Sequence, residues 1–311
     1  MSVRRAIAAM TVGCIAMAAA VTAAPIVRAA EVDQAPDCGN PVASYEPMFA
    51  LPGPGEAPAG SSMAEIQAHG ALVVGVSADT MLFGARNPIS GDIEGFDIDV
   101  LHEVAEAIFG DPNAIEYKVI TYAQRIPSIL DGSVDLVAHT MTINCTRWEQ
   151  IAFSSVYFNA GQRVLVRSDS DVAGIDDLDG LRVCAAEGST NLDALDAYPG
   201  VEQVPVVDLT DCLVLFQQGE VDAITADDTV LEGFAAQDPY AEVVGDAFTE
   251  EPYGVGVSLQ RPDLVQFVNL VLQRMREDGT WAELYTKWLG GETGEAAPEP
   301  PAATYGRQPV L

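Results

Sequence analysis

The sequence is poor in basic residues and contains only three histidines. It holds 15 Lys and Arg against 46 Asp and Glu, which gives a formal net charge of −31 at pH 7. Proteins that bind nucleic acid or an anionic membrane surface carry an excess of Lys and Arg, so neither partner is expected. No CxxC pair and no Cys/His cluster has zinc-ligand spacing. We therefore expect no bound metal.

The motifs of common catalytic sites are missing as well. The sequence contains no nucleophile elbow and no Gly-rich phosphate loop. His102 falls in an amphipathic segment and is expected to be structural. His139 adjoins a candidate ligand loop, but a lone histidine is more often packed or capped than a general base. We expect neither a catalytic residue nor a cofactor.

The first thirty residues have the composition of an export signal. Arg4 and Arg5 precede an uncharged run over residues 6–27, and a small-residue cleavage site ends at Ala29. We interpret residues 1–30 as a signal peptide. An uncleaved membrane anchor is the alternative, because the run is long enough to span a bilayer.

Cysteine usage agrees with export. Cys14 lies inside the signal and follows Gly13 as in lipoprotein signals, so a lipid anchor there is an alternative, although the apolar run continues past it. Four cysteines in an exported chain indicate two disulfides, with three pairings open. We expect an extracytoplasmic protein, secreted or held at the cell surface. The four cysteines are Cys38, Cys145, Cys184 and Cys212.

Two proline-rich segments flank the central part of the chain. Residues 31–63 hold six prolines and residues 291–311 hold four, so the first is expected to be an arm outside the core and the second a disordered tail. Between them, short strands alternate with amphipathic helices, which indicates α/β layers. The predicted strands are Leu72–Val76, Glu116–Ile120, Leu136–Ala138, Arg163–Val166, Arg182–Ala185 and Ala223–Thr225. The predicted helices are Ile98–Phe109, Ile126–Leu130, Leu192–Ala197, Leu209–Gln218 and Asp263–Glu277.

One pattern occurs twice in this central part. Residues 129–135 and 216–222 each end a helix at a glycine and lead into a buried strand. Their spacing fits two similarly built lobes, and two ordinary helix-to-strand turns are the alternative. In open α/β sheets the ligand binds beyond the carboxyl ends of the strands. The loops 139–147 and 226–229 are therefore candidate ligand loops.

Polar residues that suit an amino acid lie in and near these loops. Thr140, Thr142 and Arg147 offer hydroxyl and guanidinium groups to a carboxylate. Asp227 is able to pair with an ammonium group, and capping of the next helix is the alternative. Arg125 opens a predicted helix, where a cation opposes the helix dipole, which suggests a local purpose.

A helix start offers a further candidate. Ser189 and Thr190 follow a predicted strand and open a helix, where free backbone N–H groups bind anions. A plain N-cap is the alternative.

At residues 95–100 the chain reads Gly-Phe-Asp-Ile-Asp-Val, followed by Val104, Ala105 and Ile108. This motif resembles the signature of bacterial ABC-transporter solute-binding proteins of family 3, the polar-amino-acid class. The resemblance covers about residues 64–290, and within the family the chain is similar to actinobacterial glutamate/glutamine-binding components. It implies a two-lobed α/β fold, the type II periplasmic-binding-protein-like fold, with a hinged cleft. Lobe 1 is implied at residues 64–159 and 253–290, and lobe 2 at 160–252.

The resemblance also assigns roles by motif position. It implies that Arg147, Thr142 and backbone groups of Ser189 and Thr190 hold the ligand's α-carboxylate. Its ammonium group would then contact Asp227 and the Thr140 carbonyl.

Three further positions carry implied roles. Arg125 matches an arginine that meets the side-chain carboxylate in glutamate- and aspartate-binding members. Tyr122 takes the aromatic-wall position, His139 adjoins the site, and Ser77 stands where some glutamine binders carry an aspartate. This last departure weakens the case for glutamine.

The expected ligand is aspartate or glutamate, with asparagine and glutamine as alternatives. The resemblance implies a monomer that is not an enzyme and that delivers its ligand by lobe closure to the permease subunits of an ABC importer. An amino-acid sensor with a membrane signalling partner is the alternative function. The resemblance pairs Cys38 with Cys145 and Cys184 with Cys212.

Overall fold

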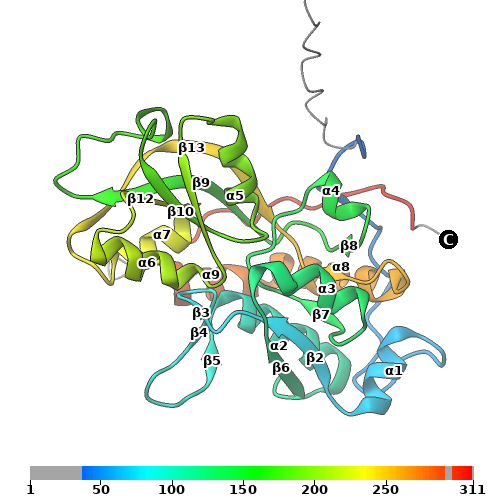
Figure 1. Cartoon of the computed structure of the whole chain (residues 1–311). Coiled ribbons are helices and arrows are strands. Elements are labelled where there is room, and N and C mark those ends of the chain that lie inside the picture. Colours follow the sequence, from blue (N-terminus) through cyan, green and yellow to red (C-terminus); the bar gives the residue numbers. More distant parts are fainter. Residues whose placement is uncertain (1–36, 291–295, 310–311) are drawn as a thin grey trace, which may run out of the picture. The chain divides into compact units, whose positions relative to one another are not determined.

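The computed structural model describes residues 37–290 and 296–309 (Figure 1). By its internal contacts the chain divides into Met1–Ala35 and Pro36–Leu311, and the fold is that of the second unit. The predicted signal peptide and the alternative lipid anchor at Cys14 lie outside the described residues.

Lobe 1 is built on a five-stranded sheet of order β6-β2-β7-β14-β8. In this sheet β2 (Leu72–Val76) pairs in parallel with β6 (Ile115–Val119) and β7 (Leu136–Val137). β14 (Gly256–Val257) runs antiparallel between β7 and β8 (Ala152–Phe153). Valine-rich β2 suits this position because β-branched side chains pack well in a sheet. The helices of this lobe are α1 (Ser62–His69), α2 (Phe96–Phe109), the 3-10 turn η1 (Tyr122–Gln124), α3 (Arg125–Leu130), α4 (Cys145–Trp148), α8 (Pro262–Asp278) and α9 (Thr280–Leu289).

Lobe 2 is built on a second five-stranded sheet, of order β11-β10-β12-β9-β13. β10 (Arg182–Ala186) pairs in parallel with β11 (Glu202–Val206) and β12 (Ala223–Asp227). β9 (Phe158–Arg167) and β13 (Ala241–Tyr253) are antiparallel. Its helices are α5 (Thr190–Ala194), α6 (Leu209–Gln218) and α7 (Asp228–Ala235), with the 3-10 turns η2 (Ile175–Asp177) and η3 (Leu195–Ala197).

The chain passes between the lobes along β9 and β13. The first residue of β9, Phe158, is paired with the last residue of β13, Tyr253, and both side chains belong to the hydrophobic core of lobe 1. Lobe 2 has separate hydrophobic clusters of its own. Two α/β lobes joined by two strands form a hinge, and the predicted fold class is confirmed.

The glycine that opens the family motif has a steric reason. A three-stranded antiparallel sheet of β3 (Asp79–Thr80), β4 (Gly84–Arg86) and β5 (Ile93–Glu94) precedes α2. Gly95 joins them with φ of 149°, and a Cβ atom at this position would lie 2.1 Å from the carbonyl oxygen of Phe83. Only glycine permits this close approach.

The described part of the C-terminal segment is ordered against the N-terminal arm, so the expectation of a disordered tail does not hold for residues 296–309. The strand β15 (Thr304–Tyr305) pairs in parallel with β1 (Ala43–Ser44). Arg307 donates hydrogen bonds to the carbonyl oxygens of Ala43, Asn40 and Cys38. A single arginine thus satisfies several main-chain acceptors of the arm, which a disordered tail would leave to water.

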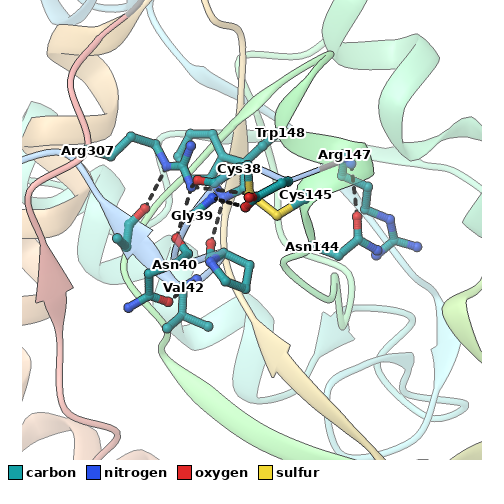
Figure 2. Close-up of a disulfide and its surroundings, with 12 residues drawn as sticks. Cys38, Gly39, Asn40, Val42, Asn144, Cys145, Arg147, Trp148 and Arg307 are labelled. Carbon is teal, nitrogen blue, oxygen red and sulfur yellow. Dashed lines mark hydrogen bonds between the residues drawn. A yellow bond between two sulfur atoms is a disulfide. The ribbon is translucent and has the colours of Figure 1, made fainter. Parts of the chain in front are cut away.

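One disulfide connects the N-terminal arm to α4 of lobe 1, and a second lies within lobe 2. Cys38 is bonded to Cys145 and Cys184 to Cys212, the pairing that the resemblance implies. Figure 2 shows the first bond between the arm and the start of α4, close to Arg147. The proline-rich arm therefore fixes the loop that carries Arg147.

Candidate ligand-binding site

The site begins where β7 ends. The chain leaves this strand through residues 139–143 and enters α4 at Asn144, whose side chain caps the helix by accepting a hydrogen bond from the backbone N–H of Arg147. Asp97, the third residue of the family motif and the second of α2, accepts a hydrogen bond from the backbone N–H of Thr140 at 2.8 Å and another from the Tyr157 hydroxyl at 2.6 Å. The motif thus positions the ligand loop.

Arg125 is buried, with 2% of its surface exposed. Its Nε donates to the carbonyl oxygen of Tyr122, and its Nη1 donates to the carbonyl oxygens of His139 and Thr140. Its Nη2 donates to the Gly188 carbonyl of lobe 2 at 3.1 Å. These bonds use four of the five N–H groups of a guanidinium. Burial lowers the Arg125 pKa, and the carbonyl contacts explain how a cation is held at this helix start.

Arg147 is the more available cation. Its Nη1 donates to the carbonyl oxygen of Thr142 at 2.7 Å, and its Nη2 donates to Gly188 at 3.3 Å. Within the described part of the chain, Nε and one N–H on each terminal nitrogen have no hydrogen-bond partner. Burial, and then the charge of Arg125, lower its pKa to about 9. A guanidinium with these free N–H groups is suited to bind a carboxylate in a bidentate manner.

Asp227 lies on the opposite lobe, at the end of β12. Its oxygens accept hydrogen bonds from Asn191 at 2.8 Å and from the hydroxyl of Tyr253 at 2.5 Å. Burial, and then the charge of Glu251, raise its pKa to about 7. A buried carboxyl with a raised pKa gains from a cationic partner such as an ammonium group.

The two hydroxyl residues of the helix start differ in their contacts. The Ser189 hydroxyl caps α5 by accepting from the backbone N–H of Leu192, and donates to the Ala186 carbonyl. The N-cap alternative therefore describes its side chain. The Thr190 hydroxyl faces lobe 1, with its oxygen 3.3 Å from the hydroxyl oxygen of Thr142.

The three other predicted residues lie in the same region, and among the described residues the Nδ1 atom of His139 is buried without a hydrogen-bond partner. Tyr122 is buried with its ring edge-on to His139, and burial raises its pKa to about 12. Burial, and then the charge of Arg125, lower the His139 pKa to about 3, so this ring is neutral. Ser77 bonds with Asp79 and Thr80 in its own turn.

Glu251 is a buried site residue that the sequence analysis missed. One of its carboxylate oxygens accepts hydrogen bonds from Thr142 at 2.5 Å and from Thr190 at 2.7 Å, and the other accepts from Thr249 at 2.6 Å. It lies near the end of β13, in a stretch for which the sequence predicted no strand. The only signal for it was a pair of acidic residues next to the crossing between lobes.

In residues 37–290 and 296–309, no group of three or more His, Cys, Asp and Glu side chains is arranged to bind a metal ion. None of the helices in these ranges combines the length and the apolarity that crossing a bilayer requires.

Comparisons with known proteins agree with this architecture. Residues 72–291 match the model of the bacterial extracellular solute-binding proteins, family 3. The chain is 35% identical over 236 residues to the ABC transporter glutamine-binding protein GlnH of Bacillus subtilis, covering 75% of this chain and 86% of the relative. It is 34% identical over 238 residues to the glutamate-binding protein GluB of Corynebacterium glutamicum, covering 72% and 80%.

Solved structures are similar as well. A mutant of the arginine-binding protein of T. maritima aligns with a TM-score of 0.70 at 32% identity, over 73% of this chain and 99% of that one. An ancestral arginine-binding protein bound to glutamine aligns with a TM-score of 0.68 at 31% identity, over 73% and 99%. The chain belongs to family 3 of the bacterial extracellular solute-binding proteins, whose members bind polar amino acids for ABC importers and are not enzymes.

Proposed function

We propose that this protein closes its two lobes around one amino acid of the glutamate and glutamine class and presents it to the permease subunits of an ABC importer. The observation that carries this proposal is that Arg147 of lobe 1 and Asp227 of lobe 2 are buried within electrostatic reach of each other. Three N–H groups of Arg147 are free for a carboxylate among the described residues, and Asp227 is a buried carboxyl suited to an ammonium group. An α-amino acid carries both groups on one carbon.

The surrounding residues extend this arrangement. We assign the α-carboxylate to Arg147 and to the backbone of Ser189 and Thr190. The resemblance assigns the Thr142 hydroxyl to it as well, but in this structure that hydroxyl donates to Glu251. The ammonium group is assigned to Asp227 and the Thr140 carbonyl. Glutamine- and glutamate-binding relatives at about one-third identity support this ligand class.

The preference for an acidic ligand rests on Arg125. The expectation that Arg125 meets a side-chain carboxylate is weakened by its contacts, because four of its N–H groups already bind main-chain carbonyls. We therefore keep aspartate and glutamate beside asparagine and glutamine as proposed ligands.

The mechanism is ligand-driven closure about β9 and β13, with lobe 1 at residues 64–159 and 253–290 and lobe 2 at 160–252. A ligand that contacts both lobes stabilises the closed form, which the permease then recognises. We propose that the mature protein acts outside the cytoplasm, on the basis of its N-terminal sequence, and that it acts as a monomer. The sensor alternative uses the same closure, and no observation favours it over transport.

Calorimetry with the purified chain lacking residues 1–30 tests this function. Glutamine, glutamate, asparagine and aspartate are titrated separately, with arginine as a cationic control. We expect at least one of the four to bind with micromolar or tighter affinity at a stoichiometry of about one. Absence of binding by all four would contradict the proposed function.

A further inference from the structure

The buried charges around this site do not add up to an excess of positive charge. Two cations, Arg125 and Arg147, face three buried carboxyl groups, Asp97, Asp227 and Glu251. His139 is neutral because burial and Arg125 depress its pKa to about 3. Asp193 of α5 and Asp228 of α7 add carboxyl groups at the edge of the site.

Among these carboxyl groups, Glu251 is placed to influence a ligand between the lobes most directly. It lies on β13, one of the two strands that join the lobes, and is only 2% exposed. Its carboxylate is held by hydroxyl groups of both lobes, Thr142 and Thr190. It also lies within electrostatic reach of Arg147 and Asp227, since its charge raises the pKa of both groups. A ligand held between Arg147 and Asp227 therefore binds in the field of Glu251.

Glu251 also limits the donors that remain for a ligand. A threonine hydroxyl has one proton to donate, and the hydroxyls of Thr142 and Thr190 both donate to Glu251. The first of these hydroxyls is among the groups that the resemblance assigns to the ligand's α-carboxylate. A second carboxylate on the ligand side chain would find few free donors and would add a negative charge to a buried cluster that is already acidic.

We propose that Glu251 makes this site reject amino acids of net negative charge, so that an amide such as glutamine binds directly and glutamate binds only together with a proton. This inference rests on the proposed function. A zwitterion with a neutral side chain leaves the charge of the buried cluster unchanged, whereas glutamate adds a full negative charge in a medium where an unpaired charge is costly. Taking up one proton with glutamate removes that difference.

The linkage between proton and ligand fixes the sign of the pH dependence. Free glutamate has an ionised side chain throughout pH 6.5–8.5. If bound glutamate carries one more proton than bound glutamine, the ratio of the glutamate Kd to the glutamine Kd rises by about tenfold for each pH unit. Groups that titrate in the protein alone, Asp227 included, cancel from this ratio.

The matched variants are Glu251→Gln and Glu250→Gln. Both remove one negative charge from adjacent positions of β13, but Glu250 is exposed. The amide oxygen of Glu251→Gln still accepts from Thr142 and Thr190, and its amino group is able to donate to the hydroxyl oxygen of Thr249, so the hydrogen-bond geometry is conserved.

Calorimetric titrations of wild type and both variants with glutamine and glutamate at pH 6.5, 7.5 and 8.5 test the proposal. For wild type and Glu250→Gln we expect the Kd ratio to rise about 100-fold over this range. For Glu251→Gln we expect a ratio at least tenfold lower at pH 7.5. A wild-type ratio that is constant with pH would overturn the proposal, as would an equal ratio in the two variants.

A second measurement needs no variant. Titrating wild type with glutamate in phosphate and in Tris at pH 7.5 separates proton uptake from binding heat, because the two buffers differ in ionisation enthalpy. We expect about one more proton taken up with glutamate than with glutamine, and equal uptake would contradict the proposal. Failure of both ligands to bind at every pH would instead contradict the proposed function.

Discussion

The hydroxyl oxygens of Thr142 and Thr190 lie 3.3 Å apart, although the first belongs to lobe 1 and the second to lobe 2. The Gly188 carbonyl of lobe 2 likewise accepts hydrogen bonds from Arg125 and Arg147 of lobe 1. These contacts describe a closed arrangement of the lobes. A ligand therefore enters through a more open form and is enclosed when these same groups come together.

Replacing Arg147 by Ala should strongly weaken the binding of every amino-acid ligand. Removing one partner of a buried, hydrogen-bonded charge pair costs about 2–5 kcal/mol, which corresponds to a loss of affinity of roughly 30-fold or more. Calorimetry with glutamine and glutamate measures the effect. Arg167→Ala is the matched control, because Arg167 is half-exposed and pairs only weakly with Asp169 at the surface. Equal affinity in the two variants would remove Arg147 from the site.

Replacing Arg125 by Ala should weaken glutamine and glutamate to the same degree and also destabilise the protein. The carbonyl groups of Tyr122, His139 and Thr140 lose their donor, and each buried acceptor left without a partner costs about 1–3 kcal/mol. Thermal unfolding and calorimetry together measure this. A selective loss of glutamate affinity at unchanged stability would restore the role in which Arg125 meets a side-chain carboxylate.

The two disulfides should differ in their contribution to stability. Cys38–Cys145 closes a span of 107 residues and Cys184–Cys212 one of 28, so the entropy of loop closure predicts about 5 and 4 kcal/mol. Paired Cys→Ser variants are compared by denaturant unfolding. Loss of the first bond should also weaken ligand binding, because it releases the loop that carries Arg147. Unchanged affinity in that variant would show that the arm has no part in positioning the loop.

The contribution of Asp227 to stability should fall as the pH rises from about 4 to 7, whereas His139, whose pKa is depressed to about 3, contributes in the opposite direction. Burial raises the pKa of its carboxyl from 3.8 to about 7, so between these values the folded state binds more protons than the unfolded state. The stabilisation is complete below pH 4 and is lost as pH passes through 7. Denaturant unfolding of wild type and Asp227→Asn across this range measures the effect. An identical pH dependence in both proteins would contradict it.

The sequence predicted the alternation of strands and helices well where the residues are strongly periodic. The predicted helix at 209–218 coincides with α6, and the predicted strand at 72–76 coincides with β2. No sequence pattern indicated β13, because this strand is interrupted by a bulge between Val244 and Thr249 and has mixed polarity. Because no strand was predicted there, Glu251 of β13 was not recognised as a candidate site residue.

The candidate site was predictable only in part, for a related reason. Arg147 and Asp227 follow strand ends, and the strand-end rule for α/β sheets points to them directly. Of the four main-chain carbonyls that Arg125 contacts, that of Gly188 belongs to lobe 2, and no local pattern encodes how the two lobes meet. The same holds for Arg307, whose three carbonyl partners lie more than 260 positions earlier in the chain.

A crystal structure of the mature protein grown with glutamine tests the central claim most directly. We predict that the ligand lies between the lobes, with its α-carboxylate on the guanidinium of Arg147 and its ammonium group on Asp227. A ligand bound elsewhere, or one whose carboxylate and ammonium groups contact neither residue, would contradict the account.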